Sequence, residues 1–290
     1  MTAAPTRIVD AHVHFWDPAR SDWYPYLSGR QQLDLGDVSG MSRRFDPATY
    51  RAEAGRWNVE KVVNVAAATG PHSIEETLEL DARAASDGDG FIAGLIGGIT
   101  PSEAVAETEA QLDRQLAASR FRGVRPMGAF EHPVPGAGVL SALAERDLVL
   151  ELMAHTHQLR SAAEALAGHD DLVVVVEHTG WPRSGSDEER ALWADGIRAL
   201  ADLGEHVVCK LSGLAMPLGS MQPDLLAPWI EGAIEAFGVD RCLFASNFPV
   251  DGMHGTLDEL FTAYATITAG LSEDDRDTLF AGTAKRVYRC

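Results

Sequence analysis

The chain has 290 residues, of which 46% are hydrophobic, and its 43 acidic and 24 basic residues give a formal net charge of −19. The hydrophobic content excludes a disordered or fibrous chain, and the negative charge argues against nucleic acid or an anionic membrane as a partner. No apolar run has the length of a transmembrane helix, so we expect a cytoplasmic protein that acts on a small molecule, with a homo-oligomer left open.

Short apolar segments alternate with amphipathic segments along the chain. The first apolar segment covers residues 8–16 and contains His12 and His14. Further strands are expected over 61–65, 91–96, 123–125, 148–153, 172–177, 207–211 and 242–245. Helices are expected over 46–57, from Ser73, from Ser102, and over 139–146, 159–167, 188–203 and 224–237. Asp46-Pro47 has the pattern of a capped helix start, and Ser73 to Glu76 has that of a capping box.

This alternation predicts an α/β fold, a somewhat distorted (β/α)8 TIM barrel. Parallel strands that are buried on both faces consist of continuous Val, Ile and Leu runs, as these segments do. A doubly wound open sheet is the competing fold, but its Gly-rich phosphate-binding turn is missing after the first strand. We expect one domain over residues 1–290, with helices over 257–267 and 272–285 that pack outside the barrel and close it.

His12 and His14 are two residues apart at the end of the first strand. Period-2 alternation turns both imidazoles to the same side, where they converge on one point. Two converging imidazoles are typical of the first two nitrogen ligands of a divalent metal, most often zinc. The open alternative is a pair of histidines that local hydrogen bonds satisfy at a strand end.

Polar residues of catalytic type follow the first strand and the fourth to eighth strands, where a TIM barrel carries its chemistry. They are His12, His14, Arg125, Glu151, His155, His157, Glu177, His178, Lys210, Ser246, Asn247 and Asp251. Taken alone, each of them could equally be a solvated loop residue or a residue whose hydrogen bond connects two loops. Their common location at the strand ends favours an active site.

Five motifs follow one another along the chain. They are DAHVHFWDP at 10–18, FRGVR at 121–125, EHTGWP at 177–182, CKLSG at 209–213 and FASNFPVD at 244–251. In this order they resemble the amidohydrolase superfamily, and most closely its lactonase-type amidohydrolase 2 group of sugar lactonases, sulfomuconolactone hydrolases and pyrone-dicarboxylate lactonases. The resemblance implies a deformed eightfold barrel that hydrolyses an ester, lactone or amide, with related branches that decarboxylate or hydrate. Some members use Zn²⁺ or Mn²⁺, and several lactonases need no metal.

The resemblance also implies roles for the matching residues. His12, His14 and His178 would ligate the metal or, in a metal-free member, polarise the substrate carbonyl. Asn247 stands where most members have an aspartate, and an amide carries no charge and cannot act as a base at neutral pH. Asn247 would therefore position water or substrate. A divalent metal, zinc first, and a metal-free mechanism both remain open.

The sequence leaves the general base undecided. His178 is the first candidate, because imidazole titrates near neutral pH, and Glu151 and Asp251 are carboxylate alternatives. Glu177 is also a carboxylate, but if His178 faces the barrel interior, alternation turns Glu177 towards the helices, where it would be structural.

The remaining candidates concern substrate contacts. Arg125 and Lys210 would hold a substrate carboxylate or the developing oxyanion, with an ion pair inside the ring of strand ends as the alternative. His155 and Trp181 are further substrate-contact candidates, as are the carboxylates named above, Glu151 and Asp251.

Three hypotheses for function follow. The first is a hydrolase that opens a lactone or related cyclic ester, carboxylated or not, by attack of water on the carbonyl. The second is a decarboxylase or hydratase of a carboxylated ring compound on the same fold. The third is a non-catalytic binding protein whose site has degenerated with the loss of the aspartate at position 247.

Overall fold

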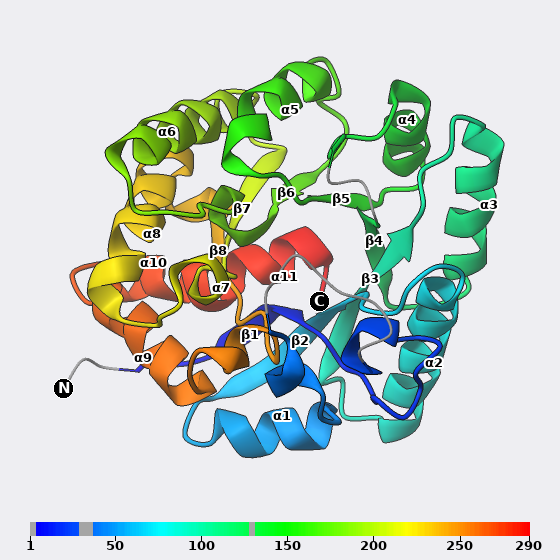
Figure 1. Ribbon diagram of the computed structural model, residues 1–290, viewed down its shortest axis with the longest axis horizontal. Helices are drawn as coiled ribbons and strands as arrows, with labels where there is room; N and C mark the ends of the chain where they lie inside the picture. Colours follow the sequence, from blue (N-terminus) through cyan, green and yellow to red (C-terminus); the bar gives the residue numbers. More distant parts are fainter. Residues whose placement is uncertain (1–3, 29–36, 128–130) are drawn as a thin grey trace.

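A computed structural model describes residues 4–28, 37–127 and 131–290, and it contains one eight-stranded parallel sheet in the order β1 to β8 (Figure 1). The strands are β1 Ile8–Val13, β2 Val59–Val65, β3 Ile92–Ile99, β4 Phe121–Pro126, β5 Val149–Leu152, β6 Val174–Val176, β7 Val207–Leu211 and β8 Cys242–Phe244. Backbone bonds of 2.8 Å from Asn247 N to His12 O and from His14 N to Phe248 O join the end of β8 to β1. The sheet is thus a nearly closed barrel, and the predicted (β/α)8 fold is confirmed.

Helices surround the barrel and connect its strands (Figure 1). They are α1 Pro47–Ala54, α2 His72–Asp87, α3 Val105–Gln115, α4 Ala137–Glu145, α5 Leu159–Leu166, α6 Asp187–Ala201, α7 Ala215–Leu218, α8 Pro223–Phe237, α9 Leu257–Ile267, α10 Glu273–Asp277 and α11 Thr283–Tyr288. In the part of the chain that the structure describes, no helix is long and apolar enough to cross a membrane.

One predicted helix cap is confirmed and the other is wrong. Asp46 caps α1, where its side chain accepts a hydrogen bond from Thr49 N at 3.0 Å. The capping box at Ser73 does not form, because α2 already begins at His72. The Glu76 carboxylate instead accepts hydrogen bonds from the backbone N of Ala67 at 2.9 Å and from the Tyr24 hydroxyl at 2.9 Å. Burial raises the pKa of Glu76 to about 7.

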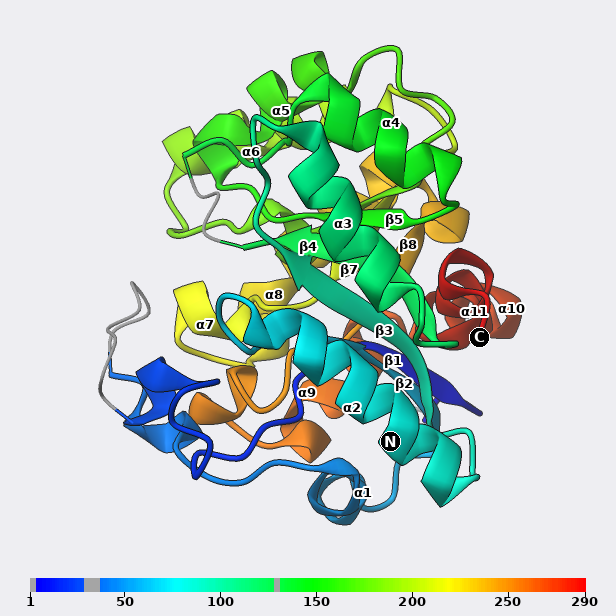
Figure 2. The ribbon, with the colours of Figure 1, turned by 90° about the vertical axis from the view of Figure 1, so that its right-hand side faces the viewer.

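An inner cluster of small and branched side chains fills the barrel. Its strand residues are Val9, Ala11, Val63, Val65, Ile96, Val149, Val175, Val208, Leu243 and Ala245, and Ala281, Ala284, Val287 and Tyr288 join them from the C-terminal segment. Figure 2 shows α11 at the end of the barrel from which the strands start. The segment that ends in α11 therefore closes the amino-terminal end of the barrel, whereas the other predicted closing helix, α9, packs against α8 and α1 in the outer ring. The carboxyl ends of the strands are left for the site.

Candidate active site

An irregularity in β1 turns His12, and His14 directly after the strand, into the barrel. Ala11 belongs to the inner cluster and Val13 to the outer core, and the pairing of β1 with β2 shifts register between Asp10 and Val13. Such a shift re-aims the side chains that follow it. His12 and His14 consequently converge, with their Nε2 atoms 3.1 Å apart.

Asp10 holds this irregular strand end from outside the barrel. Its carboxylate accepts hydrogen bonds from the Tyr50 hydroxyl at 2.6 Å and from Ser246 N at 2.8 Å. Because Tyr50 belongs to α1 and Ser246 follows β8, the carboxylate connects β1 to the surrounding helix α1 and to the end of the neighbouring strand β8. The position of His12 is thus fixed by contacts on the opposite face of the strand.

The end of β6 corrects one prediction. Glu177 does not face the helices: Val175 belongs to the inner cluster and Val176 to the outer core, so the same alternation carries Glu177 inwards. β6 ends at Val176, and the left-handed backbone of His178, with φ of 53°, turns that imidazole inwards as well. The left-handed turn at His178 breaks the alternation after Glu177, so both side chains reach the site.

Glu177 lies at the centre of the polar groups. Its Oε1 is 3.7 Å from His12 Nδ1, and its Oε2 is 3.7 Å from both His178 Nε2 and Arg125 Nη1. Within the described residues, both oxygens are buried without a hydrogen-bond partner. A buried carboxylate in that state is costly, so its environment indicates a ligand, a water molecule or a proton that completes it.

The three histidines of the site are neutral at neutral pH. Burial, reinforced by the charge of Lys210, lowers the pKa of His12 well below its usual value, and burial with Arg125 does the same for His178. Burial and Arg125 lower the pKa of His14 to about 3, although Val65 O and Asn247 raise it as hydrogen-bond partners. Neutral imidazoles are the form that ligates metals and that donates or accepts single hydrogen bonds.

A glycine makes room for His178. Its Nδ1 lies 3.0 Å from Ser212 Oγ, which fixes the ring. Gly213 follows with a φ of 65°, and a Cβ at this position would collide with His178 Nδ1. The CKLSG motif after β7 therefore both holds His178 and leaves the space that its ring occupies.

His12, Glu177 and His178 form a group that fits a divalent metal. One ligand atom from each lies within 4.8 Å of the others. Tetrahedral zinc ligands at about 2.1 Å from the ion are about 3.4 Å apart, close to the spacing of these groups. Two neutral imidazoles and a carboxylate without a partner are a suitable donor set. Glu177 is the member of this group that the sequence did not predict.

The two cations of the site have different surroundings. Arg125 is 13% exposed in its side chain, and its Nη2 donates to Ala66 O at 2.5 Å. Lys210 is fully buried, and its Nζ donates to Glu151 Oε2 at 2.7 Å. Glu151 also accepts from the Tyr288 hydroxyl at 2.5 Å, so both of its oxygens are occupied by protein groups rather than open to a substrate. Burial raises the pKa of Glu151 to about 7 against the lowering effect of Lys210.

Asn247 and Asp251 form a buried pair after β8. Asn247 Nδ2 donates to Asp251 Oδ1 at 2.9 Å, and Asn247 itself has a φ of 56°. Ala215 N approaches the other carboxylate oxygen at 3.4 Å. Burial raises the pKa of Asp251 to about 7. Asp251 thus stands behind Asn247 and orients its amide.

Aromatic side chains lie next to the histidines. The Trp181 ring is 5.1 Å from the ring of His178 and 6.4 Å from that of His155. His155 and His157 stack with their centroids 5.9 Å apart. Trp16 stacks on His14 at 5.9 Å. These rings place two of the predicted substrate-contact residues, His155 and Trp181, beside the site.

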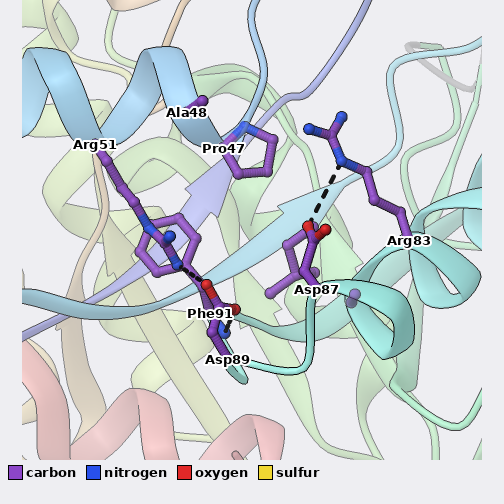
Figure 3. A pocket seen from close by; sticks show the side chains of 9 residues that line it. Pro47, Ala48, Arg51, Arg83, Asp87, Asp89 and Phe91 are labelled. Carbon is purple, nitrogen blue, oxygen red and sulfur yellow. Dashed lines mark hydrogen bonds and ion pairs between the residues drawn. The ribbon is translucent and has the colours of Figure 1, made fainter.

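A cavity of about 330 Å³ lies elsewhere, between α1, α2 and the start of β3 (Figure 3). Its charged side chains pair with each other, Arg51 with Asp89 and Arg83 with Asp87. The Arg51 guanidinium also lies 4.0 Å above the Phe91 ring. None of the residues that line this cavity belongs to the polar group around Glu177.

Comparisons with known proteins agree with this architecture. A family model described as "Amidohydrolase" matches residues 9–290. An L-fucono-1,5-lactonase of Burkholderia ambifaria is 27% identical over 300 residues, which cover 97% of this chain and 95% of that protein.

Two solved structures share the fold. An amidohydrolase from Burkholderia multivorans with bound zinc is 26% identical, with a TM-score of 0.79 over 98% of this chain and 99% of that one. A 5-carboxyvanillate decarboxylase from Sphingomonas paucimobilis is 15% identical, with a TM-score of 0.60 over 98% of this chain and 99% of that one, and it shows the fold alone.

Proposed function

The chain belongs to the amidohydrolase family, and on that premise we propose that this hydrolase opens the lactone of a sugar acid by attack of water on the ring carbonyl. The observation that carries the proposal is the Glu177 carboxylate, which lies without a hydrogen-bond partner among three neutral histidines at the carboxyl end of the barrel. The likeness over nearly the whole chain to proteins named L-fucono-1,5-lactonase supports the substrate class.

The proposed reaction begins with Glu177. Its partnerless carboxylate accepts a proton from water, which attacks the lactone carbonyl as hydroxide. Arg125, with Nη1 3.7 Å from Glu177 Oε2, stabilises the negative charge that develops on the carbonyl oxygen. When the ring ester bond breaks, Glu177 returns the proton to the leaving alkoxide. Asn247 positions the attacking water through its oriented amide.

Zinc is the proposed metal, held by His12, Glu177 and His178. A bound zinc ion would supply Lewis acidity at the carbonyl oxygen. Support comes from the matching donor set in this chain and from the zinc in the Burkholderia multivorans relative. His14, whose Nε2 lies 3.1 Å from His12 Nε2, borders this group, and the Trp16 ring stacks on its imidazole.

Proton release and carbon dioxide release from a substrate panel test the proposal. The panel contains L-fucono-1,5-lactone, other aldonolactones and a carboxylated pyrone lactone, each with protein as purified and with added zinc. We expect proton release from an aldonolactone without carbon dioxide, and loss of that activity in His178→Ala with the fold retained. Carbon dioxide release from a carboxylated ring would favour the decarboxylase, and full activity of His178→Ala would overturn the assignment of the site.

A further inference from the structure

A chain of hydrogen bonds runs through the barrel from α11 to β1. The Tyr288 hydroxyl donates to Glu151 Oε1 at 2.5 Å, and Lys210 Nζ donates to Glu151 Oε2 at 2.7 Å. Lys210 Nζ also lies 3.5 Å from His12 Nδ1. All four residues are completely buried. Helix α11, which Figure 2 shows at the end of the barrel from which the strands start, is thereby connected to His12 in β1.

The chain continues beyond His12. His12 Nε2 is 3.1 Å from His14 Nε2, and His14 Nδ1 is 2.8 Å from Val65 O. A backbone carbonyl only accepts, so the single ring proton of neutral His14 is on Nδ1. Its Nε2 is then bare and accepts from His12, which places the single proton of His12 on Nε2.

The other end of the chain leads to the same result. The Lys210 ammonium offers only donors, so it requires a bare Nδ1 on His12. Glu177 Oε1, 3.7 Å from the same nitrogen, offers only acceptors when ionised and would favour a proton on Nδ1. His12 Nδ1 therefore lies between a donor and an acceptor, and the position of Lys210 decides which tautomer forms.

The surroundings of Lys210 argue against a purely packing role. The inner cluster around it consists of apolar side chains such as Val149, Val175 and Val208, which fill the barrel without charge. A buried ion pair costs several kcal/mol of desolvation, and apolar residues of similar size are often as stabilising. Packing alone does not call for Glu151 and Lys210, whereas a donor directed at His12 requires them.

We propose that Tyr288 and Glu151 are positioning residues that hold Lys210 against His12 Nδ1 and so set the tautomer of His12, with its Nε2–H directed to His14 and the site. This inference concerns the metal-free site, because a bond from His12 Nδ1 to zinc would use the lone pair that accepts from Lys210. It rests on the proposed function only in treating His12 as part of the reactive group. It assigns a role in the site to α11, which lies at the opposite end of the barrel.

Nitrogen-15 NMR of histidine-labelled, metal-free protein tests the proposal, because bare and protonated ring nitrogens differ widely in chemical shift. We expect wild-type His12 with a protonated Nε2 and a bare Nδ1. The double variant Glu151→Gln/Lys210→Met removes both charges together, and its His12 should carry the proton on Nδ1, directed to Glu177. Tyr288→Phe keeps the ion pair and the ring, and should give a mixture of the two tautomers with a several-fold lower kcat and an unchanged KM.

Tyr264→Phe is the matched control. Tyr264 is also fully buried, and its hydroxyl donates to Ala245 O at 3.1 Å, outside the chain of bonds. Its removal should leave the His12 signals unchanged. Wild-type His12 signals in both Tyr288→Phe and the double variant would overturn the proposal, whatever the activity. A change of tautomer in a protein that hydrolyses no lactone would support the positioning role and contradict the proposed function instead.

Discussion

Glu177 Oε2 lies 3.7 Å from His178 Nε2, although consecutive residues of a strand point to opposite sides. The contact exists because β6 ends at Val176 and the left-handed backbone of His178 brings its ring back to the carboxylate. A short strand followed by a left-handed turn thus provides two adjacent functional side chains in one site.

The first prediction concerns the space beside His178. Gly213→Ala should lower kcat by at least about tenfold, because the new Cβ displaces the His178 ring and a 1 Å misplacement of a catalytic group costs about that much or more. Gly219→Ala is the control, since Gly219 has nearly the same φ, 66° against 65°, and nothing within 4 Å of its Cβ position. Both variants place an alanine at nearly the same positive φ, so a difference in their steady-state kinetics reports the collision. Equal activity of the two would refute the role of Gly213.

The second prediction concerns the amide at position 247. Asn247→Asp places two carboxylates at the 2.9 Å contact with Asp251, so the free energy of unfolding should fall by about 1–3 kcal/mol at pH 8. At pH 5 one of the two carboxyls is protonated, so the free energy of unfolding of the variant should approach that of wild type. Urea denaturation at both pH values measures the difference. The exchanged pair Asn247→Asp/Asp251→Asn should restore stability at pH 8, and an unstable exchanged pair would contradict this explanation.

The third prediction concerns Glu76, outside the site. Its folded-state pKa of about 7 exceeds the unfolded value, so the unfolded chain ionises first as the pH rises. Between pH 4.5 and 7 the folded state should lose up to about 3 kcal/mol through this group. Glu76→Gln keeps an acceptor for Ala67 N and offers a donor to Tyr24.

Denaturation curves at pH 5 and pH 8 give this comparison directly. The loss of stability on going to pH 8 should be about 3 kcal/mol smaller in Glu76→Gln than in wild type. If the free energy of unfolding changed equally with pH in wild type and in Glu76→Gln, Glu76 would be ionised throughout this range.

The fourth prediction concerns metal binding. Because the pKa values of His12 and His178 lie well below the usual range, protons should not compete with zinc for these rings between pH 6 and pH 8. Competition with a chromogenic chelator should give one zinc per chain, with nearly the same affinity at both pH values once the chelator is corrected for pH. A tenfold loss of affinity at pH 6 would indicate ordinary histidines and a different group of ligands.

The fold was largely predictable from the sequence. Buried strands such as β8, Cys242–Phe244, are recognisable by uninterrupted apolar residues, and the His-x-His spacing correctly indicated that His12 and His14 converge. The inward direction of Glu177 was not predictable, since it depends on where β6 ends and on a positive φ at a non-glycine residue. The same holds for Tyr288, because no local pattern shows that a side chain of the last helix reaches Glu151 inside the barrel.

Hydrolysis of L-fucono-1,5-lactone or the preferred aldonolactone by Glu177→Gln, compared with wild type, tests the central role of Glu177. The amide has the same shape but can neither accept the proton of water nor supply a charged ligand. We predict a loss of kcat of at least about 100-fold with unchanged or higher stability, and wild-type activity in Glu188→Gln, whose side chain is exposed on α6. A Glu177→Gln enzyme within about threefold of wild type would contradict the proposed role of this carboxylate.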